Sequence, residues 1–127
     1  MTVYRDESEE LLNFLQSQGV QGVLFLSGDR HHTELLKVER EGFYPLYEFT
    51  SSPLTAGARK RTKDDAEFNN PLRVEGTLYS GEHNYGVLEV SGPRKKRVLT
   101  LKAVGMDGES RWTHVIKQEE LRPPRNK

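Results

Sequence analysis

A carboxylate, a guanidinium and two imidazoles stand together directly after a short apolar run. The segment Ser27-Gly28-Asp29-Arg30-His31-His32 follows Gly-Val-Leu-Phe-Leu at residues 22–26. In open α/β sheets, ligands gather at the carboxyl ends of strands. Asp29 and His31 are two residues apart, so in an extended chain their side chains project to the same side. Oxygen and nitrogen donors of this kind suit a divalent cation, and the sequence therefore indicates Asp29 and His31 as candidate metal ligands.

Each of these residues also has an ordinary structural interpretation. An aspartate after a strand is commonly a turn residue, and adjacent histidines are commonly just exposed. Arg30 suits a surface position or a salt bridge. His32 points away from His31 along an extended chain, so it either supports a ligand or is purely structural. Glu34 is expected to be a solvated strand residue.

The elements that position this segment are one helix followed by strands. Leucines 11, 12 and 15 have helical spacing, Asp6 and Glu9 resemble a capping box, and Gly19 suits the helix end. The apolar run at 22–28 is typical of a strand covered on both faces. Further strands are expected over residues 33–39, 43–49, 75–80, 85–91, 97–104 and 111–117. This order predicts an α+β or α/β fold with one N-terminal helix and about seven strands, mixed and then antiparallel.

The length and charge of the chain limit its organisation. With 127 residues it fits one domain, expected over residues 1–120, with a long charged surface loop at 56–73 and a flexible tail at 121–127. Nineteen Lys and Arg balance nineteen Asp and Glu, so no overall field attracts nucleic acid or an anionic membrane. The basic clusters at 59–61 and 94–97 are expected to be solvated surface rather than phosphate contacts.

The sequence excludes several classes of site. It has no cysteine, and therefore no disulfide, zinc–thiolate site or thiol nucleophile. No apolar stretch reaches the roughly 20 residues of a membrane span, and the acidic amino-terminal segment does not resemble a signal peptide. The cellular compartment stays undetermined.

An ordered series of segments resembles a known enzyme family. Gly28-Asp29-Arg30-His31 is similar to the closing motif of the PhoD-like (alkaline phosphatase D type) branch of the calcineurin-like metallophosphoesterases. Elsewhere in that superfamily the corresponding motif is more often Gly-His-X-His. Segments similar to the same family follow in order at residues 44–55, 70–74 and 84–86, in the Asp-Gly hairpin at 107–108 and at Trp112. The resemblance covers nearly the whole chain.

The resemblance implies the C-terminal half of a four-layer α/β/β/α sandwich with a dinuclear metal site between its sheets. In that family a metal-activated hydroxide attacks a phosphate mono- or diester. By position His31 is implied as a metal ligand, and Asp29 either ligates a metal or orients a ligand. Arg30 and His32 are the residues implied to lie nearest a phosphate. Divalent or trivalent ions (Mn, Fe, Zn or Ca) are implied for the full-length family, and this chain binds either one of them or none.

The family draws its other metal ligands from earlier motifs, and nothing in this chain resembles them. We therefore predict that the isolated chain is inactive, and whether it counts as an enzyme stays open. The alternative is a non-catalytic β-rich binding or interaction module on the same scaffold. The partners implied are a phosphate ester in the complete enzyme, and an N-terminal half or a second copy of this chain. Neither a membrane nor nucleic acid is expected as a partner. Members of the family are often exported, but the sequence itself leaves the compartment undetermined.

Overall fold

The computed structural model describes residues 5–125 and, within them, one α-helix and six strands. This composition confirms an α+β fold. The helix α1 spans Arg5–Ser17, and two short 3-10 helices follow later in the chain. The strands are β1 (Leu24–Ser27), β2 (Glu34–Val38), β3 (Leu46–Thr50), β4 (Asn84–Ser91), β5 (Val98–Gly105) and β6 (Ser110–Lys117). The 3-10 helices are η1 (Ala66–Asn69) and η2 (Gln118–Leu121).

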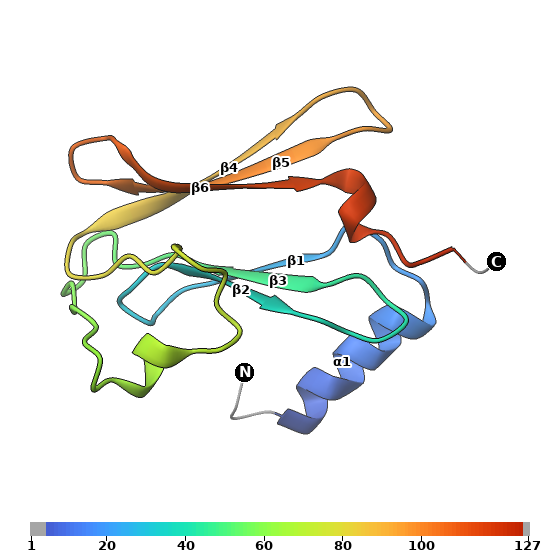
Figure 1. The fold of residues 1–127 in the computed structure, drawn as a ribbon, viewed down its shortest axis with the longest axis horizontal. Coiled ribbons are helices and arrows are strands. Elements are labelled where there is room, and N and C mark those ends of the chain that lie inside the picture. Colours follow the sequence, from blue (N-terminus) through green and yellow to red (C-terminus); the bar gives the residue numbers. More distant parts are fainter. Residues whose placement is uncertain (1–4, 126–127) are drawn as a thin grey trace.

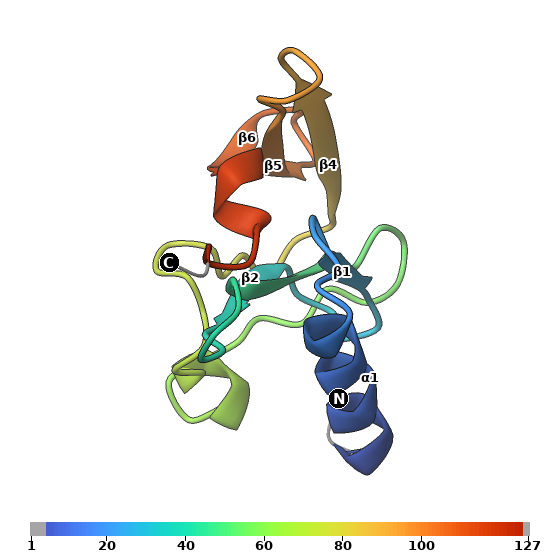
Figure 2. The ribbon, with the colours of Figure 1, turned by 90° about the vertical axis from the view of Figure 1, so that its right-hand side faces the viewer.

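The strands form two three-stranded sheets that lie one above the other, with α1 below the first sheet (Figure 1). The first sheet has the order β1-β3-β2, with β1 parallel and β2 antiparallel to β3. The second sheet is an antiparallel meander in the order β4-β5-β6. Figure 2 shows that β1 and β4, one edge strand from each sheet, lie on the same side of the molecule.

The main core lies between the two sheets. Side chains along β3 point alternately to the two faces of the first sheet. Phe49 points to the second sheet, where its ring packs edge-on against that of Trp112 with centroids 5.4 Å apart. Leu101 and Ile116 of the second sheet are fully buried beside them. Leu121, the first residue of the predicted flexible tail, packs into this core, and its carbonyl accepts a 2.9 Å hydrogen bond from Gly22.

Two expectations about strands were wrong. β1 was expected to be covered on both faces, but it is an edge strand and Leu26 is 62% exposed. Residues 75–80 were expected to form a seventh strand, but Tyr79 forms only an isolated bridge with Thr33. Gly76, at φ 80, sends the chain through a turn, which prevents a continuous ladder.

The helix lies where its leucine spacing predicted it. Gly19 follows it with φ 61, the left-handed conformation that glycine adopts at helix ends. Leu12 packs against the core, whereas Leu11 and Phe14 stay exposed. Within residues 5–125, no helix combines the length and apolar character that crossing a bilayer demands.

Two strand glycines offer a matched test of packing between the sheets. A Cβ at Gly86 would lie 2.8 Å from Cζ of the buried Phe49, whereas a Cβ at Gly105 would lie 2.6 Å from the guanidinium of Arg111. A buried ring cannot move aside, but the end of an arginine side chain can. We expect Gly86→Ala to lower the free energy of unfolding by about 1–3 kcal/mol and Gly105→Ala by less than about 1 kcal/mol, as measured by urea denaturation. Equal losses would contradict the close contact at Gly86.

Candidate functional site

The turn after β1 brings Asp29 and His31 to one cavity. Both residues have a left-handed backbone, with φ 67 and φ 60, a conformation that is uncommon for residues other than glycine and that clusters at functional sites. The cavity has a volume of about 430 Å³ and is lined by Asp29, His31 and the three arginines at positions 30, 59 and 61. The sequence placed Asp29 and His31 together by assuming an extended chain; they meet instead through this tight turn.

The imidazole of His31 is held in a defined orientation. The backbone N–H of His31 donates to Oγ of Ser52 at 2.9 Å, and Nδ1 lies 2.6 Å from the carbonyl oxygen of Gly57. A carbonyl only accepts, so the proton of the neutral ring is on Nδ1 and the lone pair is on Nε2. This is the arrangement found for most metal-bound histidines, whose other nitrogen donates to a carbonyl or a carboxylate.

A buried network of polar side chains lies behind the cavity. His32 and Glu34 have no exposed surface. Nδ1 of His32 lies 3.1 Å from Nε of Arg61 and 3.2 Å from the carbonyl oxygen of Arg30. Nε2 of the same ring lies 3.1 Å from Oε1 of Glu34. The angle of the contact between Nε2 of His32 and Oε1 of Glu34 departs from that of an aligned hydrogen bond. The other carboxylate oxygen of Glu34 accepts from Nε of Arg73 at 2.7 Å.

The network sets the charge state of Glu34. Burial alone would raise the pKa of this carboxyl, but the contacts from His32 and Arg73 outweigh it, and the pKa of Glu34 is lowered from 4.5. Glu34 is therefore an ionised, fully buried carboxylate. The expectation that it would be a solvated strand residue was wrong, because Glu34 is buried and paired with Arg73, which ends the loop at 56–73.

The loop at 56–73 is tied to this end of the first sheet. Arg61 also donates to the backbone carbonyl of Arg30 at 2.6 Å, and Arg73 donates to the carbonyl of Phe68. The expectation of a solvated basic cluster at 59–61 was therefore wrong for Arg61, while the side chain of Arg59 is 67% exposed. The signal missed in the sequence was the His-Thr-Glu spacing, which places His32 and Glu34 on one face of a strand.

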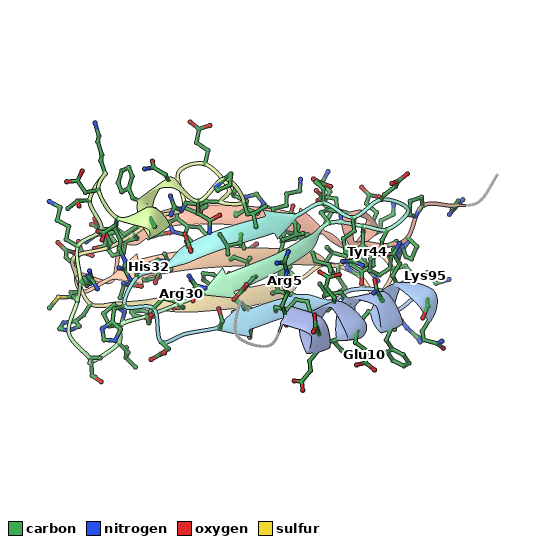
Figure 3. The ribbon with its side chains drawn as sticks, turned by 90° about the horizontal axis from the view of Figure 1, so that it is seen from below. Arg5, Glu10, Arg30, His32, Tyr44 and Lys95 are labelled. Atoms are coloured by element: carbon green, nitrogen blue, oxygen red, sulfur yellow. The ribbon has the colours of Figure 1, made fainter. Side chains whose placement is uncertain are left out.

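Segments far apart in the sequence contact one another around the turn after β1. The hydroxyl oxygen of Thr33 lies 3.0 Å from the carbonyl oxygen of Ser52. The backbone N–H of Asn84 donates to the carbonyl of Pro53 at 2.9 Å, and its side chain accepts from Thr33. Nε2 of His83 lies 2.7 Å from the carbonyl of Ala56. These contacts fix the chain on either side of the turn, and Figure 3 shows Arg30 and His32 at this end of the first sheet.

The cavity offers two side chains of the kinds that bind metal ions. One imidazole nitrogen and one carboxylate are available there, and the residues that the structure describes contain no group of three or more His, Cys, Asp or Glu placed to hold a metal ion. Three arginines beside these donors favour an anion over an isolated cation. His32 is fully buried and cannot contact a phosphate directly, so any effect on a ligand passes through Arg61.

Comparisons with protein-family models, with curated proteins and with solved structures found no match.

Proposed function

We propose that this chain is the C-terminal part of a metal-dependent phosphoric ester hydrolase of the alkaline phosphatase D type. The observation that carries the proposal is the fixed imidazole of His31, whose Nδ1 proton is held by Gly57 beside an arginine-lined cavity. A histidine oriented in this way offers Nε2 to a cation, and the arginines offer charge to a phosphate. The order of segments that resembles this family supports the same conclusion.

The residues have distinct roles in this proposal. His31 holds a divalent cation through Nε2, and Asp29 supplies a second donor or orients the first. Such a cation, when bound, acts as a Lewis acid toward a phosphate ester. Arg59 binds phosphate oxygens; its ion pair with Asp65 is 3.7 Å long and exposed, and therefore competes weakly. Arg61 holds the backbone of Arg30 and so positions the turn.

The proposal includes the finer architecture, in which the helix and two sheets form the C-terminal half of a four-layer sandwich. In support, β1 and β4 end their sheets on the same side of the molecule (Figure 2). Three apolar side chains on these strands, Leu26, Leu88 and Val90, are exposed there. Strands from an N-terminal half, or from a second copy of the chain, would cover them and extend both sheets.

A titration with Mn²⁺ tests the role of His31. We expect amide signals of residues 28–32 to broaden selectively in ¹H–¹⁵N NMR spectra, and we expect His31→Ala to abolish most of this broadening. His83→Ala is the matched control, because the ring of His83 also contacts a backbone carbonyl, yet the residue lies outside the set that lines this cavity. Broadening that survives His31→Ala, or that His83→Ala removes equally, would contradict the proposal.

The isolated chain is expected to hydrolyse a chromogenic phosphate ester negligibly, because its cavity offers two protein donors where hydrolytic metal sites use three or more. Turnover with added Mn, Fe, Zn or Ca that His31→Ala abolishes would show that the chain is sufficient alone. The second candidate is a non-catalytic binding module, favoured by the small donor set. It predicts no selective metal effect at residues 28–32.

A further inference from the structure

A second group of cations lies at the end of the molecule opposite the His31 cavity. The hairpin between β4 and β5 carries Arg94, Lys95, Lys96 and Arg97, and the register of β5 and β6 pairs Val98 with Lys117. The fold therefore brings Lys117, which is 20 positions beyond Arg97 in the sequence, next to this basic cluster. Figure 3 shows Lys95 far from Arg30 and His32.

All of these cations except Arg94 line a cavity of about 270 Å³ in the protein surface. Lys95, Lys96, Arg97 and Lys117 contribute to its lining, and Glu119 is the carboxylate among the lining residues. A concave surface brings several cations within reach of one ligand, which scattered surface lysines cannot do. We refer to this site as the hairpin cavity.

The lysines of the hairpin cavity differ from cations elsewhere in the protein. Lys37 pairs with Glu39 at 3.2 Å, Lys102 with Glu89 at 3.4 Å, and Arg111 with Asp107 at 2.9 Å. Among the residues described, no carboxylate lies within 4.0 Å of the amino groups of the three lysines at 95, 96 and 117. Neighbouring like charges repel each other, and a bound anion would relieve that repulsion.

The backbone that presents these cations is already ordered. Lys96 donates its N–H to the carbonyl of Pro93 at 2.9 Å, and Arg97 exchanges hydrogen bonds of 2.9 Å with Gln118. The guanidinium of Arg97 donates to the carbonyl of Gly92, and that of Arg122 to the carbonyl of Lys95. Binding therefore has to order lysine side chains but no backbone, which lowers its entropic cost.

We propose that the hairpin cavity binds a compact soluble anion with several phosphate groups, such as a short polyphosphate chain. Clustered lysine and arginine side chains suit phosphate oxygens. The cavity is near the lower limit of ligand clefts, about 300 Å³, so it fits a compact anion better than an extended polymer. Its lining contains no aromatic ring on which a nucleobase could stack. This site is independent of the His31 cavity and of the proposed hydrolysis.

Isothermal titration with tripolyphosphate, together with NMR mapping, tests the proposal. At about 20 mM salt we expect binding, with shifted amide signals at residues 94–97 and 117. Raising salt to about 200 mM should weaken binding at least about tenfold, because the attraction is between charges. The triple variant Lys95→Gln, Lys96→Gln, Lys117→Gln should weaken binding at least about tenfold.

The control is a triple variant with the same change in net charge, Lys37→Gln, Lys63→Gln, Lys102→Gln. Lys63 is an exposed residue of the loop at 56–73. Its affinity should stay within about twofold of the unchanged protein. Absence of binding at low salt, equal weakening in both triple variants, or shifts at residues 28–32 instead would overturn the proposal. The proposal would also be overturned if duplex DNA or vesicles containing anionic lipid bound more tightly than tripolyphosphate and lost this binding in the first triple variant. The ligand of the hairpin cavity would then be that polymer or membrane.

Discussion

Replacing Glu34 by alanine is expected to lower the free energy of unfolding by about 3–5 kcal/mol, as measured by urea denaturation near pH 7. Glu34 is fully buried, and its removal leaves the guanidinium of Arg73 and the ring of His32 without the carboxylate that they contact. The double variant Glu34→Leu, Arg73→Leu should recover part of the loss, because neither charge of that pair then stays buried.

The control for this change is Glu39→Ala. Glu39 also pairs with a cation, Lys37, but its side chain is 75% exposed, so we expect a loss below about 1 kcal/mol. Similar losses for the buried and the exposed carboxylate would show that the network around Glu34 does not stabilise the fold.

The same carboxylate predicts how stability depends on pH. The pKa of Glu34 is lower in the folded protein than the 4.5 of an unperturbed carboxyl, so the unfolded chain takes up this proton at a higher pH than the folded chain. The contribution of Glu34 is then fully present above about pH 5 and is lost as the pH falls through the folded pKa. The difference in stability between the unchanged protein and Glu34→Ala should therefore shrink in acid. A difference that grows in acid would contradict the lowered pKa.

Local patterns were enough to predict the helix and the hairpins. Leucine spacing and Gly19 located α1, and Asp107-Gly108 located the turn between β5 and β6, with Gly108 at φ 79. In both cases the structural choice depends on residues within a few positions of one another. The turn at 28–32 was not predicted, because Asp29 and His31 were expected on an extended chain and instead adopt a left-handed backbone.

The burial of Glu34 could not be predicted in the same way. Its covering arginine, Arg73, is 39 residues away in the sequence, and Arg61 is 29 residues from His32. Whether a charged strand residue is solvated depends on such distant partners, and a local pattern contains no information about them. The sequence therefore identified the donors of the candidate site, but it missed the tight turn that brings them to one cavity and the network that supports this turn.

The exposure of Leu26 has a similar cause. A short apolar run has the same composition in a central strand and at the edge of a sheet, since only the order of the strands decides which faces are covered. The order β1-β3-β2 places Leu26 at an edge, although its register partner Phe49 is 2% exposed.

These register partners give the second large prediction. Leu26 and Phe49 lie side by side on the same face of the first sheet, but only Phe49 is covered by the second sheet. Phe49→Ala should lower the free energy of unfolding by about 3–5 kcal/mol, because it removes a buried ring and leaves a cavity between the sheets. Leu26→Ala should cost less than about 1 kcal/mol, since most of its side chain already meets solvent.

The single tryptophan of the chain reports this difference directly, because the ring of Trp112 packs edge-on against Phe49. In Phe49→Ala the fluorescence of the folded protein should shift toward that of a solvated indole, whereas Leu26→Ala should leave the spectrum unchanged. Equal destabilisation by the two substitutions, or an unchanged spectrum in Phe49→Ala, would show that the two sheets are not joined through this pair of rings. The stacking of the sheets would then depend on other contacts, such as those of Leu101 and Ile116.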